Sequence, residues 1–232
     1  MHSEREVLRR ASPRDRLRRV TIGGMSLSSD LGRGLRLPRQ ERRSQLLAAA
    51  QEVFVAHGYH AAAMDEIAER AGVSKPVVYQ HFPGKLELYL ALLDMSCAAL
   101  VAAVEAALSS TPDNKQRVHA TVAAYFDFVD DDGGAFRLVF ESDLTNEIAV
   151  SQRVEATNEA CARLLSKVIT ADTGLSDDEG LLLGWGLTGM AQTAARAWLR
   201  EDDRIPKSTA VDRVASLAWR GIRGFPLSHP KP

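Results

Sequence analysis

The sequence has only two cysteines in 232 residues. Cys97 and Cys161 lie far apart, and neither belongs to a CxxC pair or a Cys/His cluster, so the sequence predicts no zinc site. Both fall in helical patterns, where a cysteine usually serves as a small buried apolar side chain. We expect no metal and no cofactor.

Long apolar runs are also missing. No uninterrupted run reaches the roughly 18 residues that a membrane-spanning helix needs. The N-terminus lacks the apolar core of a signal peptide. These two absences predict a cytoplasmic protein without a membrane partner.

The sequence lacks the motifs of common enzyme classes. It contains no GxSxG, no HExxH and no phosphate-binding loop. His57 and His60 are explained by a helix end and its loop, and His119 is expected on the surface. The acidic run at 130–132 lacks the alternate spacing of calcium ligands, which favours a solvated loop. We therefore expect no catalytic residues and no enzyme.

Charge is distributed unevenly along the chain. The formal net charge is −1, which alone argues against a nucleic-acid binder. Residues 1–85, however, carry 15 Lys and Arg against 9 Asp and Glu, and residues 86–232 carry 14 against 21. A basic first third on an acidic remainder fits a DNA-binding head on a different kind of body.

The pattern of apolar residues is helical from Arg39 onwards. Residues 1–38 are rich in arginine and glycine without an apolar period, so they are expected to form a disordered basic tail. No strand alternation occurs anywhere, which predicts an all-α fold. About nine helices are expected, at 39–57, 64–71, 74–82, 85–110, 114–130, 135–143, 146–170, 177–200 and 206–223. Gly58 is suited to end the first of these helices. Ser176 and Glu179 have the spacing of a capping box at the start of the helix at 177–200.

Residues 64–82, MDEIAERAGVSKPVVYQHF, have the pattern of a helix-turn-helix. Ile67 and Ala68 are expected to face inward, and Gly72 permits the turn. Ser74 is a suitable N-cap for the second helix. Either Val77 or Val78 packs inward from this helix, and the other valine then lies on the DNA side. Such a second helix can lie in a major groove.

The outward residues of the second helix suit DNA recognition. Lys75 and Gln80 can donate to base edges or phosphates, and Tyr79 and His81 can reach phosphate. Lys85, at the start of the next helix, is expected to meet the DNA backbone together with the helix N-terminus. The predicted DNA-binding set is Arg43, Ser74, Lys75, Pro76, Val77, Tyr79, Gln80, His81 and Lys85.

The stretch from Glu41 to Leu93 resembles the N-terminal domain of TetR-type regulators. Its most specific elements are IAERAGVS, then VVYQHF, then the lysine that follows Pro83-Gly84. The resemblance implies an all-helical homodimer that binds double-stranded operator DNA and dimerises through its last two long helices. The implied domains are 39–84 for DNA binding and 85–225 for ligand binding and dimerisation.

The chain departs from the family just before the first helix of the motif. The family commonly has Thr or Ser there, whereas this chain has Ala61, Ala62 and Ala63. Losing a hydroxyl cap costs about 0.5–2 kcal/mol of helix stability. Asp65 can compensate for the missing cap through its interaction with the helix dipole, although DNA phosphates would repel its negative charge.

The remainder of the chain predicts a hydrophobic effector. A ligand cavity is mostly apolar with a few polar groups, and Arg137, Asn158 and Gln192 are the polar candidates. GGAFRLVFESD (133–143) resembles a stretch found in a subset of TetR-type regulators. Taken with the whole chain, it resembles the regulators of fatty-acid synthase genes that respond to long-chain acyl-CoA. The alternative is an efflux or catabolic regulator with another small hydrophobic ligand. The predicted ligand-binding set is Leu92, Met95, Phe126, Val129, Phe136, Arg137, Phe140, Leu164 and Trp185.

Two rival functions remain at this stage. An enzyme would have to show turnover of a tightly bound ligand. A helical interaction module would bind without steep salt dependence, whereas phosphate contacts give a steep slope of log affinity against log salt.

Overall fold

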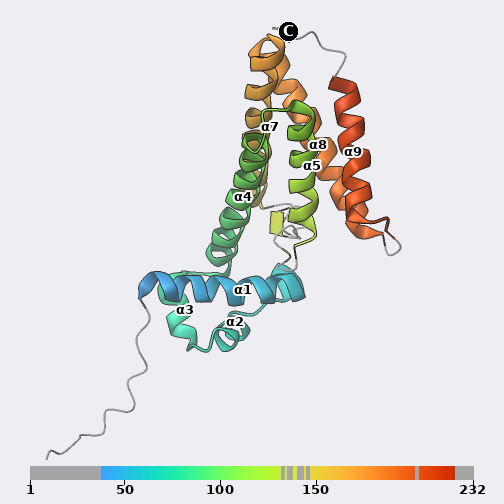
Figure 1. Ribbon diagram of the computed structural model, residues 1–232. Coiled ribbons are helices and arrows are strands. Elements are labelled where there is room, and N and C mark those ends of the chain that lie inside the picture. The colour runs from blue at the N-terminus through green and yellow to red at the C-terminus, as the bar shows by residue number, and fades with distance from the viewer. Residues whose placement is uncertain are drawn as a thin grey trace, which may run out of the picture. The chain divides into compact units, whose positions relative to one another are not determined.

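A computed structural model describes residues 38–131, 134, 138–139, 144, 147–201 and 204–222, and these are helical with no strand among them (Figure 1). The all-α prediction is confirmed. The predicted tail before Pro38 lies outside the described residues, as does most of the helix predicted at 135–143. The eight described helices are α1 (Arg39–Ala61), α2 (Met64–Arg70), α3 (Lys75–His81), α4 (Lys85–Ser109), α5 (Asn114–Val129), α7 (Ile148–Thr173), α8 (Asp177–Arg200) and α9 (Lys207–Ile222).

Helix α1 buries the apolar face that its sequence predicts. Leu46, Ala50, Val53 and Phe54 are all at most 3% exposed. Gly58, predicted to end the helix, has φ 73° and ψ 170°, so the helical geometry breaks there although the helix resumes to Ala61. A residue with a side chain rarely adopts this φ, which explains the glycine.

The helix-turn-helix has the predicted interior. Ile67 and Ala68 are buried, and Gly72 turns the chain with φ 63°. The structure decides between the two valines: Val78 is fully buried, and Val77 is only partly covered.

Of the helix caps that the sequence predicts, one forms its side-chain hydrogen bonds and one does not. The capping box at the start of α8 is present, because the Ser176 hydroxyl accepts from the Glu179 N–H and the Glu179 carboxylate accepts from the Ser176 N–H. Ser74 does occupy the N-cap of α3, but its side chain makes no capping hydrogen bond. Ala63 at the N-cap of α2 makes none either, as the missing hydroxyl predicted.

Helix α4 is long and apolar, although Asp94 and Glu105 interrupt its apolar run, as the sequence analysis found. Of the described helices, it is the one long and apolar enough to cross a membrane, judged by length and composition alone. The core helix of a globular protein passes the same test. Leu88, Leu92, Leu93 and Leu100 of α4 are fully buried, so its composition is explained by packing inside the protein.

Helices α7 and α8 pack against each other in opposite directions, at a distance that only glycine allows. A Cβ built on Gly184 would collide with the backbone carbonyl of Ala162. One turn earlier, a Cβ on Gly180 would meet Ser166 and Thr170. This close contact fixes the register between the two helices.

Charged residues join the C-terminal end of α5 to the start of α9. The Lys207 ammonium lies 2.9 Å from the Asp127 carboxylate and 3.1 Å from that of Asp130. Both carboxylates raise the pKa of Lys207 through hydrogen bonds. Arg204 stands 3.6 Å from Asp130 and lies over the Trp198 ring. Asp130, predicted to lie in a solvated loop, is therefore part of an ion-pair network.

We predict that Gly184→Ala destabilises the protein by about 1–3 kcal/mol, the usual cost of overpacking, because the backbone of α7 must move. Gly221→Ala is the matched control, since its Cβ would meet nothing within 4 Å. The control should be neutral or slightly stabilising because alanine has the higher helix propensity. Urea denaturation measures both, and equal stability of the two variants would refute the close-contact account.

Candidate DNA interface and ligand core

Helix α3 presents most of the predicted DNA-binding residues to solvent. Lys75, Pro76, Tyr79 and Gln80 are exposed, as is Ser74 at its N-cap. Val77 and His81 are partly covered. Because Val78 anchors the opposite face in the core, the exposed side of α3 is free to enter a groove.

Lys75 forms an ion pair within the DNA-binding head, which consists of α1, α2 and α3. Its ammonium lies 2.9 Å from the carboxylate of Asp65 on α2, and the hydrogen bond with Asp65 raises the pKa of Lys75. Both side chains are about half exposed or more, so the pair contributes little to stability. To contact DNA, the Lys75 ammonium must either break its hydrogen bond with Asp65 or keep it and use another of its three N–H groups.

Arg43 of α1 holds the end of α3. Its guanidinium donates to the carbonyl of His81 at 3.3 Å and lies 4.2 Å from the centre of the Phe82 ring. A cation beside the last carbonyls of a helix stabilises that end. The position therefore has a structural role beside the predicted DNA contact.

A cluster of arginines surrounds the end of α3. Partial burial lowers the pKa of His81, and the charges of Arg39, Arg43 and Arg42 lower it further. The His81 imidazole therefore lies in a positive potential at this edge. Sequence analysis had singled out Arg43 but not Arg39 and Arg42, although their i, i+3 and i+4 spacing puts all three near one face of α1.

The structure gives Lys85 a different environment from the predicted one. Its ammonium donates to the carbonyls of Tyr59, His60 and Ala62, at 2.8, 3.2 and 3.0 Å. It also lies 4.5 Å from the centre of the Tyr59 ring. An ammonium has three donors, so all of them are used to tie the start of α4 to the last residues of α1 and the first residue after it.

Part of the predicted ligand set lies in the core. Leu92, Phe126 and Val129 are at most 1% exposed, and Leu164 is partly buried against them. Two residues do not belong there: Met95 is 47% and Trp185 38% exposed, because both lie on outward faces of their helices. Phe136, Arg137 and Phe140 lie outside the described residues.

Buried polar groups in this core went largely unnoticed in the sequence. Thr121, Tyr125 and Thr188 are at most 5% exposed, and their hydroxyl oxygens have no hydrogen-bond partner in the described part of the chain. The buried Oδ1 of Asn158, which sequence analysis did list, has none either. Burial raises the pKa of Tyr125, and contacts of its hydroxyl with the Cys161 thiol and the Thr188 hydroxyl shift the pKa further, upward and downward respectively. Neither contact has the geometry of a full hydrogen bond.

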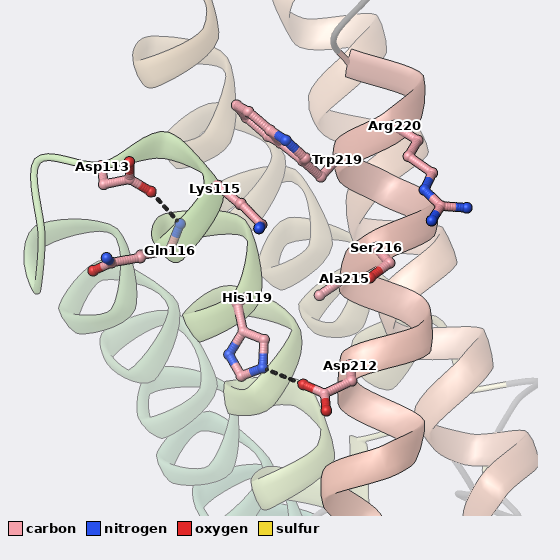
Figure 2. A pocket seen from close by; sticks show the side chains of 9 residues that line it. All are labelled: Asp113, Lys115, Gln116, His119, Asp212, Ala215, Ser216, Trp219 and Arg220. Atoms are coloured by element: carbon pink, nitrogen blue, oxygen red, sulfur yellow. Dashed lines mark hydrogen bonds and ion pairs between the residues drawn. The ribbon is translucent and has the colours of Figure 1, made fainter.

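A surface groove lies between α5 and α9, away from this core (Figure 2). Its volume is about 740 Å³, and Trp219 and Lys115 project into it. The His119 ring lies 2.9 Å from the Asp212 carboxylate and joins the two helices. The groove is open and lined by charged residues of both signs, so it differs from the apolar site that the sequence predicts.

Comparison with known proteins identifies the family. Residues 46–92 match the model for bacterial regulatory proteins of the tetR family. The HTH-type transcriptional activator FasR of Mycolicibacterium smegmatis is 49% identical over 196 residues, which cover 84% of this chain and 90% of that protein. This chain belongs to the TetR family of transcriptional regulators.

Solved structures agree with this assignment. A TetR-like transcriptional regulator from Rhodococcus sp. RHA1 has a TM-score of 0.65 at 25% identity, covering 82% of this chain and all of that one. The regulator FadR from Bacillus subtilis, in complex with stearoyl-CoA, has a TM-score of 0.61 at 19% identity, covering 75% and 96%. The second similarity shows the shared fold.

We predict that Lys85→Met lowers the free energy of unfolding by about 1.5–3 kcal/mol, the value of hydrogen bonds to a charged group. At temperatures where the variant is folded, the slope of log DNA affinity against log salt should be unchanged. Lys75→Met is the matched comparison, with little loss of stability and a slope smaller by about 1. A stable Lys85→Met protein with the smaller slope would instead show that Lys85 contacts phosphate.

We predict opposite outcomes for two buried tyrosines. Tyr89 donates to the Leu138 carbonyl at 3.3 Å, so Tyr89→Phe removes a buried hydrogen bond and costs about 0.5–1.5 kcal/mol. Tyr125→Phe removes a hydroxyl without a partner and should change stability by less than about 0.5 kcal/mol, or increase it. Chemical denaturation of both variants, without added ligand, tests this. Similar losses in the two would mean that Tyr125 is hydrogen-bonded in the ligand-free protein.

Proposed function

We propose that this TetR-family regulator binds operator DNA as a homodimer in the cytoplasm and responds to a long-chain acyl-CoA. The observation that carries the proposal is the 49% identity to FasR along 84% of the chain, because it extends well beyond the DNA-binding head into the body. The relative's name further suggests that the output is activation of transcription.

The head supports DNA binding through its charge and shape. The exposed side of α3 carries Lys75, Tyr79 and Gln80, and the arginines at the start of α1 border its C-terminal end. Together these groups supply donors for base edges and cations for phosphates. We propose the predicted set without Lys85, whose ammonium holds the head to α4, and with Arg39 and Arg42 added.

The outer faces of α8 and α9 support dimerisation. Leu182 is 73%, Leu217 65% and Trp185 38% exposed. Gly186 has open space around it, so a partner helix can approach closely. We therefore reassign Trp185 from the ligand core to the dimer interface.

The apolar core of the body suits a fatty acyl chain. Leu92, Phe126 and Val129 supply an apolar surface between α4 and α5, and a cavity for such a chain is lined mainly by groups of this kind. The structural neighbour FadR was solved with stearoyl-CoA, which is consistent with this ligand class. Another hydrophobic ligand is the alternative that the experiment below distinguishes.

Helix α4 provides the route by which a ligand would act on DNA binding. Its first turn holds the head through Lys85, and one turn later Tyr89 packs against Phe54 and Tyr59. Leu92, at the next turn, belongs to the proposed ligand core. A ligand that shifts α4 would change the separation of the two heads, and a dimer must match half-sites spaced by whole helical turns.

Fluorescence anisotropy with DNA from upstream of the protein's own gene tests this function. The proposal predicts tight, salt-steep binding that hexadecanoyl-CoA changes by at least about fivefold, the lower range of allosteric coupling. Binding that lipids leave unchanged would remove the acyl-CoA effector. If no DNA fragment binds even at low salt, the proposed DNA-reading surface is wrong.

We predict that Leu182→Glu weakens dimerisation by more than about tenfold, because an unpaired carboxylate would be buried at the interface. Ile148→Glu is the matched control, since Ile148 is 68% exposed on α7. Light scattering after size exclusion should show the first variant as a monomer and the second as a dimer. A dimeric Leu182→Glu protein would place the interface elsewhere.

A further inference from the structure

The most unusual feature of the body is its group of buried oxygens without partners. Folded proteins pair nearly all of their buried polar groups, and each exception calls for a water, a ligand or a function. Here four such oxygens occur together with an apolar core: Thr121 Oγ1, Tyr125 Oη, Asn158 Oδ1 and Thr188 Oγ1. We call them the polar cluster.

The helices bring the polar cluster to one level of the bundle. Thr121 and Tyr125 are one turn apart on α5. On α7 and α8, the contact between Gly184 and Ala162 sets an opposite-running register, so that Thr188, one turn further along α8, comes level with Asn158, one turn earlier on α7. Tyr125 also lies beside Thr188. Tyr125 and Thr188 are therefore neighbours, and Asn158 lies at the same level of the bundle as Thr188.

The chemistry of the polar cluster selects the kind of group that would satisfy it. Three hydroxyls can each donate to an acceptor oxygen. The cluster itself contains no cation, and a buried carboxylate without one is strongly unfavourable. On α8, Arg196 also has a buried Nε without a partner among the described residues, but it is eight residues from Thr188, about 12 Å along a helix. A neutral carbonyl oxygen fits this environment, whereas a carboxylate does not.

We propose that the polar cluster binds the carbonyl oxygen of an acyl thioester, with the alkyl chain against the apolar core around Phe126. This inference rests on the proposed function and adds that the protein reads the thioester carbonyl itself. The Tyr125 and Thr188 hydroxyls donate to that oxygen, and Thr121 and Asn158 complete the surroundings. In the absence of ligand, the same groups are free to bind water.

Two ligands that differ only at this carbonyl test the inference. Hexadecanoyl-CoA has the thioester oxygen, and S-hexadecyl-CoA is a thioether that lacks it. Calorimetric titration of the full-length protein should give roughly tenfold tighter binding of the thioester, the ratio expected for one hydrogen bond to a buried group. Equal affinities would overturn the inference and leave the proposed function standing. If neither ligand binds, the acyl-CoA effector fails and the inference fails with it.

Substitutions in the polar cluster should remove the preference for the thioester over the thioether. Tyr125→Phe and Thr188→Val should each reduce the ratio between thioester and thioether severalfold, through weaker thioester binding alone. Thr157→Val is the matched control, because Thr157 is buried at 6% exposure but donates to the Arg153 carbonyl of its own helix. Its ratio should equal that of the wild type. A ratio unchanged in both cluster variants, with melting temperatures showing folded protein, would overturn the assignment.

Discussion

Helix α4 is attached to the DNA-binding head by hydrogen bonds of Lys85. The three donors of Lys85 are directed to the carbonyls of two residues in the last turn of α1 and of Ala62 just after it, so the first turn of α4 cannot shift without carrying the head with it. Tyr89 continues this attachment, since its ring packs at the edge of Phe54 and its hydroxyl reaches the Leu138 carbonyl. Gly134 comes close to Val55 of α1, so the segment after α5 also contacts the head.

The interior of the body, formed by α4 to α9, contains buried oxygens without partners in the part of the chain that the structure describes. A bundle built only for stability would pair its buried hydroxyls or replace them with apolar groups. The body instead keeps the polar cluster unpaired beside an apolar core, while close α7–α8 packing at Gly184 holds its geometry. A ligand that supplies the missing partners would gain binding energy from them, and α4 connects the body to the head.

The sequence predicted the fold better than the sites. Helical periodicity, Gly58, Gly72 and the Ser176–Glu179 capping box placed most of the helix ends, because these are local signals. The role of Lys85 could not be predicted in the same way, since its partners lie 23 to 26 residues earlier in the chain. Met95 and Trp185 share the apolar character of core residues, and only the packing of neighbouring helices shows that they face outward. Tyr125 and Thr188 become informative only when the packing of α5 against α8 brings them together.

The distance between the two heads in the dimer tests the central claim most directly. A spin label at Glu69→Cys, on α2 of each protomer, reports that distance by pulsed electron resonance, and the native Cys97 and Cys161 are buried away from the labelling reagent. The account predicts that hexadecanoyl-CoA shifts the distance by several ångströms, in wild-type-like protein that is folded and dimeric. An unchanged distance, under conditions where the same ligand alters DNA affinity, would contradict transmission through α4.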